Sequence, residues 1–169
     1  AAKQRYKLLG TDIEDVKKEL LEVNNLALEG KPEDMVITSH ICRGNYHSTF
    51  FTSGPYDSVA DYVFAKENVD ALFLEYDDAR SGGFAPLAKV SPDKKVVLGL
   101  ITTKTPQLEE KEVVIKRIHE AAKYIPLDRL YLSPQCGFAS CEIGNKLTEE
   151  EQWAKLKLVK EIAEEVWGE

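Results

Sequence analysis

The segment Val96-Val97-Leu98-Gly99-Leu100-Ile101 decides the fold class. It contains no polar side chain, and an apolar run of this length predicts a β-strand that is covered on both faces. Strands of this kind are typical of parallel sheets, in which the connecting helices pack against the sheet. Further apolar runs at about 35–42, 71–74 and 130–133 predict three more strands.

Helical patterns alternate with these strands. Apolar residues at intervals of three and four predict amphipathic helices at about 11–30, 59–66, 109–124 and 148–168. The first and the last begin with Thr-x-x-Glu, at Thr11 and Thr148, which is the pattern of a capping box. The resulting order, α-βα-βα-βα-βα, predicts an α/β fold with parallel strands and right-handed crossovers.

The length fits one ordinary domain or an incomplete larger one. The predicted strands repeat about every 32 residues, and eight such units would need the roughly 250 residues of a (β/α)8 barrel. The chain has 169 residues and four predicted strands, which is half of the eight strands in that barrel. A four-stranded doubly wound sheet is the alternative, although the chain opens with a helix that no visible strand precedes. Residues 1–10 fit no element.

Composition and charge exclude several classes of protein. The 22 Lys and Arg residues against 29 Asp and Glu give a net charge of −7, which repels nucleic-acid phosphates and anionic lipids. No apolar stretch approaches the roughly 20 residues of a membrane helix, and the first residues lack the apolar core of a signal peptide. We therefore expect a soluble, cytoplasmic protein with no nucleic-acid or membrane partner. Three cysteines at irregular spacing favour thiol chemistry or metal binding over a disulfide framework.

Potential metal ligands follow three of the predicted strands. His40 and Cys42 end the first strand and point to the same side, because strand residues two apart share a face. Glu75 ends the second strand, and Cys136 follows the fourth. Ligands bind at the carboxyl ends of strands in parallel α/β folds, and zinc accepts nitrogen, sulfur and carboxylate oxygen. These residues form a candidate zinc site, with ordinary buried cysteines as the alternative.

Three segments together resemble the catalytic zinc half of cobalamin-independent methionine synthase, and they are most similar to its short, single-barrel relatives. They are Thr38-Ser39-His40-Ile41-Cys42, Phe73-Leu74-Glu75-Tyr76-Asp77 and Leu132-Ser133-Pro134-Gln135-Cys136-Gly137-Phe138. The resemblance implies the C-terminal half of a (β/α)8 TIM barrel, a single partial domain over residues 1–169. It implies zinc ligands at His40, Cys42, Glu75 and Cys136. It also implies methyl transfer from 5-methyltetrahydrofolate to homocysteine, which binds the zinc as a thiolate.

The sequence departs from this family after the third strand. Methionine synthases usually have Asp-x-His-Ser there, with the His as proton donor toward the folate, whereas this chain has Thr102-Thr103-Lys104-Thr105. Lys104 is a candidate proton donor if burial or the metal lowers its pKa, and an ordinary loop lysine otherwise. The family's carboxylates for the substrate amino group, and its tryptophan under the folate ring, belong to earlier strands that this chain lacks.

Other polar residues near the predicted strand ends have weaker patterns. Arg43 and His47 lie on the loop after the first strand, where they are candidates for binding a substrate carboxylate or a polyglutamate tail, or are simply solvated. Asp77 is a candidate hydrogen-bond partner for His40. Cys141 is expected to be a thiol outside the metal site.

The leading hypothesis is a zinc-dependent thiol methyltransferase. One alternative is a related alkyltransferase with a different donor or thiol acceptor, which Lys104 favours. Another is a catalytically silent zinc-binding or assembly module, which the missing barrel half favours. In each case an isolated parallel sheet would leave hydrophobic edges open. The remaining strands, including one beneath the first helix, are therefore expected from the rest of a longer chain or from another subunit.

Overall fold

The computed structural model describes residues 2–168, which form a four-stranded sheet with helices packed against one face. The strands are β1 (Thr38–Ile41), β2 (Ala71–Glu75), β3 (Lys95–Ile101) and β4 (Leu130–Pro134). The α-helices are α1 (Ala2–Leu8), α2 (Ile13–Ala27), α3 (Asp57–Ala60), α4 (Val63–Lys66), α5 (Lys111–Ala121) and α6 (Glu149–Trp167). Short 3-10 helices occur at η1 (Ala79–Ser81), η2 (Ala85–Lys89) and η3 (Leu127–Arg129).

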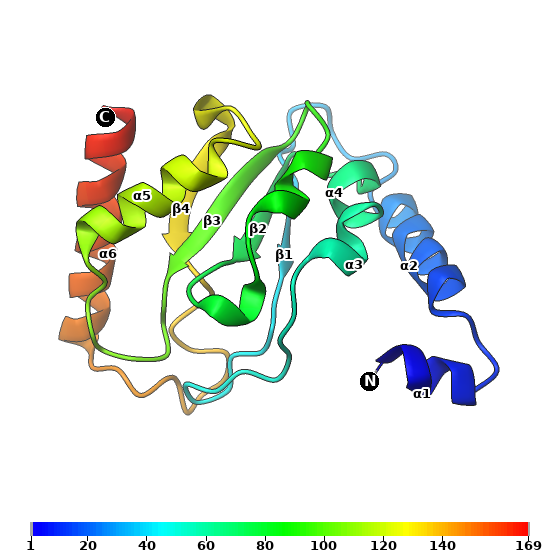
Figure 1. The fold of residues 1–169 in the computed structure, drawn as a ribbon, viewed down its shortest axis with the longest axis horizontal. Helices are drawn as coiled ribbons and strands as arrows, with labels where there is room; N and C mark the ends of the chain where they lie inside the picture. Colours follow the sequence, from blue (N-terminus) through cyan, green and yellow to red (C-terminus); the bar gives the residue numbers. More distant parts are fainter. Residues whose placement is uncertain (1, 169) are drawn as a thin grey trace.

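The strands are parallel and pair in the order of the chain, β1-β2-β3-β4. A doubly wound sheet reverses its strand order at a switch point. The uninterrupted order therefore excludes that alternative and confirms the α/β class with successive barrel strands. All carboxyl ends lie at one edge of the sheet, at the bottom of Figure 1, where the loops after β1 and β4 run together.

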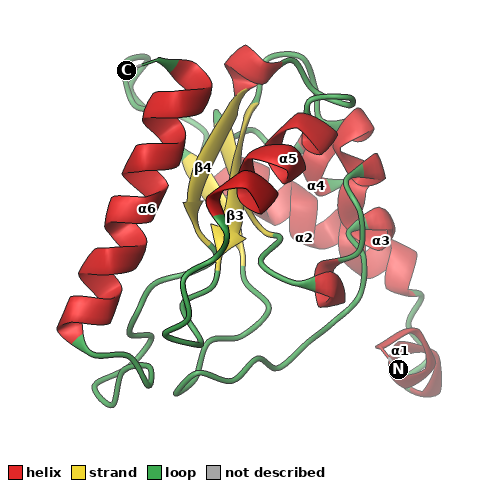
Figure 2. Ribbon diagram, turned by 60° about the vertical axis from the view of Figure 1, so that its left-hand side comes forward, coloured by secondary structure: helices red, strands yellow, loops and turns green. Residues whose placement is uncertain are grey.

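One face of the sheet is covered by helices. Leu72, Val96 and Leu130 are register partners on this face, and all three are fully buried. They share a core with Ile118 of α5 and Ile162 of α6. Figures 1 and 2 show these two helices flanking β3 and β4. Burial of branched apolar side chains between helix and sheet is the main force that stabilises the fold.

The opposite face of the sheet is open. His40, Phe73, Val97 and Tyr131 occupy one register row on this face. Val97 is buried, whereas the other three are not, Tyr131 being 40% exposed. In a complete (β/α)8 barrel this face is the interior, filled by layers of side chains from all the strands. The open face is therefore the concave side of a partial barrel.

The observed helices differ from the expected ones in three places. The predicted helix at 59–66 is two short helices, α3 and α4, because β-branched and aromatic residues such as Val59, Tyr62 and Val63 form helices weakly. Asp12, and not Thr11, caps α2 by accepting a hydrogen bond of 2.9 Å from the backbone N–H of Glu14. Residues 2–8, which fit no predicted element, form α1.

The capping box predicted at Thr148 is confirmed. The Thr148 side chain accepts a hydrogen bond from the backbone N–H of Glu151. The Glu151 carboxylate in turn accepts one from the backbone N–H of Thr148. The first strand is shorter than the predicted 35–42, because Met35 belongs to a turn with Pro32. Within residues 2–168, no helix combines the length and the apolar character that crossing a membrane requires.

Helix α2 buries none of its residues against the rest of the described chain. Leu20, Val23 and Leu26 are each more than half exposed. Polar contacts attach the end of this helix to α4, since Asn25 donates to the carbonyl of Lys66 at 2.9 Å. That α2 packs outside a further strand stays a prediction.

Gly99 of β3 generates the first testable prediction. A Cβ atom at this position would lie 2.7 Å from Cα of Gln135 and 2.9 Å from the carbonyl oxygen of Leu74, both backbone atoms of neighbouring strand ends. We expect Gly99→Ala to lower the free energy of unfolding by about 1–3 kcal/mol, measured by urea denaturation, because the strands must move apart. Gly83 is the matched control: a Cβ there meets nothing within 4 Å, so Gly83→Ala should change stability by less than about 0.5 kcal/mol. Equal effects at the two positions would contradict the packing argument.

Candidate metal site

The residues predicted as metal ligands meet at the carboxyl edge of the sheet. His40 lies in β1, Glu75 ends β2, and Cys42 and Cys136 lie just beyond β1 and β4. One potential ligand atom from each of these residues lies within 4.8 Å of all the others. The two Sγ atoms are 4.0 Å apart, and Nε2 of His40 is 3.5 Å from Oε1 of Glu75. The structure thus brings together the whole predicted set.

The electrostatics of this cluster attract positive charge. Hydrogen bonds to Cys136 and then to Glu75 raise the pKa of His40 to about 10, against the opposing effect of burial. The hydrogen bond with His40 also lowers the pKa of the Cys136 thiol. The protonated His40 imidazole is stabilised by the neighbouring thiol and carboxylate. The same negative electrostatic potential would stabilise a bound metal cation.

Glu75 is fully buried and is held on both carboxylate oxygens. Burial alone would raise its pKa, but hydrogen bonds from His40 and from the backbone N–H of Arg43 outweigh burial and lower it. The Arg43 N–H lies 3.0 Å from Oε1, and a guanidinium nitrogen of Arg80 lies 3.3 Å from Oε2. Oε1 therefore faces the cluster, while Oε2 faces Arg80.

Arg80 is a site residue that the sequence patterns did not indicate. Its guanidinium is buried and contacts Glu75, Asp77 at 2.8 Å and Asp78, and it lies over the ring of Phe50 at 4.9 Å. Asp77 therefore pairs with Arg80, and the described residues include no hydrogen bond between Asp77 and His40. The only signal in the sequence was an arginine close after an acidic run.

Lys104 lies buried on the loop after β3. Burial lowers the pKa of its amine, although the charges of Asp77 and Glu75 oppose this effect. Among the described residues, its Nζ has no hydrogen-bond partner. Lys104 is therefore a loop lysine whose amine is buried, and its role as a proton donor stays a prediction.

Arg43 and His47 are built into the loop after β1. The Arg43 side chain is 7% exposed and stacks on Tyr56, with its guanidinium carbon 4.2 Å from the ring centroid. Nδ1 of His47 lies 3.1 Å from the carbonyl oxygen of Gly144, in the loop after β4. Both side chains have contacts within the protein, and their binding of a substrate stays a prediction. Cys141 is an exposed free cysteine that is not in the cluster.

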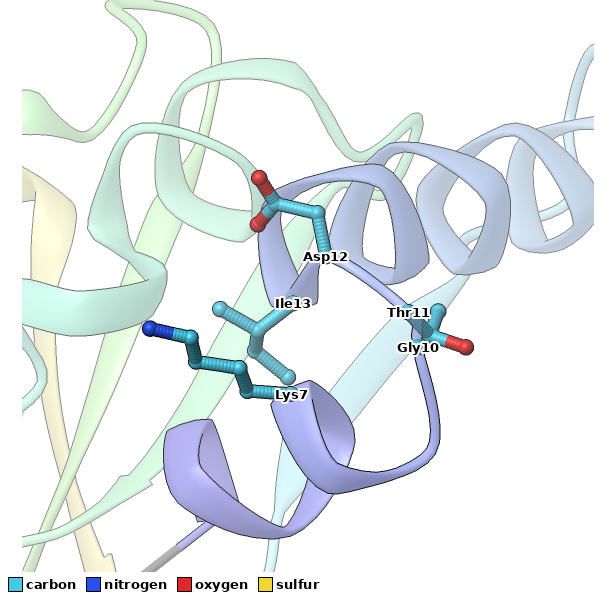
Figure 3. Close-up of a pocket in the computed structure, with 5 residues that line it drawn as sticks. All are labelled: Lys7, Gly10, Thr11, Asp12 and Ile13. Atoms are coloured by element: carbon cyan, nitrogen blue, oxygen red, sulfur yellow. The ribbon is translucent and has the colours of Figure 1, made fainter.

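A hollow of about 300 Å³ adjoins the potential ligands on the open face of the sheet. Its lining combines an imidazole, a thiol and the ring of Phe73 with backbone of the segment after β4. A second hollow, of about 450 Å³, lies where α1 meets α2 and is lined by Lys7, Gly10, Thr11, Asp12 and Ile13. Figure 3 shows that this second hollow has no thiol or imidazole among its lining residues. Of these two hollows, the first opens beside His40 and Cys136 of the cluster.

Two known proteins are similar to this chain in sequence. It is 50% identical over 165 residues to the uncharacterized protein YxjG of Bacillus subtilis, covering 97% of this chain and 44% of that protein. It is 25% identical over 170 residues to 5-methyltetrahydropteroyltriglutamate–homocysteine methyltransferase of Bacillus licheniformis, covering 99% of this chain and 20% of that protein. The chain thus spans less than half the length of these relatives.

A solved structure has the same fold. It is a candidate vitamin-B12-independent methionine synthase from Listeria monocytogenes, with a TM-score of 0.73 and 45% sequence identity over 95% of this chain and 44% of that chain. The match to less than half of that structure agrees with a partial barrel. Residues 18–165 match the family model described as cobalamin-independent synthase, catalytic domain. The chain therefore belongs to the cobalamin-independent synthase catalytic-domain family.

Proposed function

We propose that this chain is the zinc-binding part of a methyltransferase that transfers a methyl group to the sulfur of a thiol such as homocysteine. The observation that carries the proposal is the cluster of His40, Cys42, Glu75 and Cys136, whose ligand atoms lie within 4.8 Å of one another. Membership of the cobalamin-independent synthase family supports the reaction type.

The donor set fits zinc. Zinc in proteins is bound tetrahedrally by cysteine sulfur, histidine nitrogen and carboxylate oxygen, which are the groups assembled here. Two thiolates and one carboxylate would leave a bound zinc site with a charge of about −1. When bound, zinc would supply the charge that lets a thiol substrate bind as its thiolate at neutral pH.

The protein's own residues orient the acceptor and the metal ligands. The hollow beside His40 and Cys136 is apolar at Phe73 and has room for a small thiol. Arg80 and the Arg43 N–H hold the Glu75 carboxylate in place. Alkylation of sulfur depends mainly on such orientation, together with protonation of the leaving group.

Lys104 is our proposed proton donor toward the methyl donor. Its amine is buried, has no hydrogen-bond partner among the described residues, and has a lowered pKa, so its proton is held less tightly than that of a solvated lysine. By resemblance the donor is 5-methyltetrahydrofolate. Lysine at the position where the family has histidine favours a second candidate, a related enzyme with a different methyl donor.

The rest of the barrel must complete the substrate site. Within the described residues, the His40, Phe73 and Tyr131 side chains on the open face are not buried. The remaining strands would come from a longer chain or from another subunit, and would also cover the exposed side chains of α2. Without that half, a silent zinc-binding or assembly module is the alternative.

The metal assignment predicts a clear difference among the cysteines. Cys42→Ser and Cys136→Ser should each abolish tight zinc binding, because a neutral hydroxyl replaces a thiolate ligand. Cys141→Ser is the matched control and should keep one zinc per chain. Metal analysis after dialysis measures both results. Stoichiometric zinc in both of the first two variants would show that the assignment is wrong.

Activity tests the proposed function. The protein, supplied with its complete barrel, is expected to form methionine from homocysteine and 5-methyltetrahydrofolate, and Lys104→Met should reduce kcat at least tenfold while leaving the zinc content unchanged. Methionine formation with a sulfonium donor but not with the folate would establish the second candidate. Stoichiometric zinc with no transfer from either donor class would reject the enzyme in favour of the silent module.

Arg80 predicts a pH-dependent contribution to stability. Arg80→Met would leave Asp77 buried without its cation and would remove one of the cationic partners of Glu75, which should cost about 3–5 kcal/mol at pH 7 in urea denaturation. Because the folded-state pKa of Glu75 is lowered, this stabilisation exists above the ordinary carboxyl pKa and is lost as the pH falls through the folded value. The deficit of the variant should therefore shrink below about pH 4.

The matched control for Arg80 is Lys89, which forms an exposed ion pair with Asp61. Lys89→Met should cost at most about 1 kcal/mol. A deficit for Arg80→Met that is as small as this, or that does not change with pH, would contradict the role given to the buried guanidinium.

A further inference from the structure

The two thiols of the cluster follow the two outer strands of the sheet, β1 and β4. Cys42 follows β1 and Cys136 follows β4, and two other strands lie between these two. Neighbouring strands are about 4.8 Å apart, so three strand intervals amount to roughly 14 Å along a flat sheet. The Sγ atoms are nevertheless only 4.0 Å apart. Strand spacing alone therefore does not set this distance; the curvature of the sheet and the loops that follow the strands do so.

Asn145 and Asn45 join these loops directly. Asn145 Nδ2 donates to Oδ1 of Asn45 at 2.9 Å, and Asn45 Nδ2 donates to the carbonyl of Gly137, next to Cys136, at 2.6 Å. Asn145 also donates to the carbonyl of Thr103, in the loop after β3, at 2.8 Å. One amide side chain thus contacts the loops after β1 and β3 from within the loop after β4.

The loop after β1 depends on these contacts for its conformation. His47 and Ser48 have φ angles of 44° and 66°, in the left-handed region that side-chain-bearing residues rarely adopt. Asn145 accepts a hydrogen bond from the Ser48 N–H at 3.0 Å, and Ser48 Oγ accepts one from the N–H of Lys146 at 2.8 Å. Strained backbone conformations of this kind persist only where contacts with the surrounding structure fix them. The surroundings here are the loop that carries Cys136.

We propose that Asn145, acting with Asn45, is a positioning residue that holds the two thiols at metal-binding distance. The inference rests on the proposed metal-binding function. Neither amide lies in the ligand cluster. Their role is to lock the loop after Cys42 to the loop after Cys136, so that both sulfurs are in place before a cation binds.

Cobalt titration of the metal-free protein tests this proposal, because the thiolate-to-cobalt absorption band and the d–d bands report the number and geometry of the sulfur ligands. Asn145→Ala is expected to lower the Co²⁺ affinity at least tenfold and to weaken the thiolate band. Asn25→Ala is the matched control. Asn25 also accepts from a backbone N–H, that of Asn68 at 2.7 Å, and donates to a carbonyl, that of Lys66 at 2.9 Å, but it lies away from the cluster. The Asn25→Ala variant should therefore keep the Co²⁺ affinity and the absorption spectrum of the parent protein.

A second variant keeps the test decisive if Asn145→Ala does not fold, as judged by circular dichroism. Asn45→Ala leaves the Asn145 bonds to Thr103 and Ser48 intact and should produce the same spectral loss. Where both variants fold, the double variant should lose no more affinity than the larger single loss, because the two amides act as one unit. Parent-like affinity and spectra in the folded variants would overturn the positioning role. Failure of the parent itself to bind Co²⁺ would reject the metal site, and with it this inference.

Discussion

Glu75 is fully buried at the end of β2, and three groups keep it ionised there: the imidazole of His40, the backbone N–H of Arg43 and the guanidinium of Arg80. A buried carboxylate without such partners would be strongly destabilising. Satisfying this one anion brings the loop after β1 and the helix η1 onto the end of β2. The position of Cys42 beside the carboxylate is a consequence of that arrangement.

The site is thus held in two different ways. His40 and Glu75 lie on adjacent paired strands, so the backbone ladder of β1 and β2 sets their separation. The two thiols lie beyond strands that do not pair, and side-chain amides join their loops instead. Gly99 serves both parts, since the absence of its Cβ lets the backbone of Gln135, next to Cys136, approach β3. Precise geometry at the edge of this sheet therefore depends on a few small or amide-bearing residues.

The chain contains the candidate metal site but leaves one face of its sheet open. The chain carries every group of the candidate metal site at the carboxyl ends of its strands, together with the buried Lys104 amine. On the open face, the His40, Phe73 and Tyr131 side chains are not buried within the described residues, and the chain covers 44% of the B. subtilis relative. Our proposal therefore assigns metal binding to this chain and substrate recognition to the complete barrel.

The sequence by itself determined the fold class and the potential ligands. Continuous apolar strands alternating with amphipathic helices are sufficient to predict a parallel α/β fold, because burial pattern and period are local properties of the chain. His40, Cys42, Glu75 and Cys136 were predictable because ligands gather where parallel strands end. Only the tertiary structure decided the strand order, the burial of Lys104 and the contacts of Arg80 and Asn145. Those features rest on contacts between residues far apart in the chain, such as Asn45 and Asn145, and no local pattern encodes which distant loops will meet.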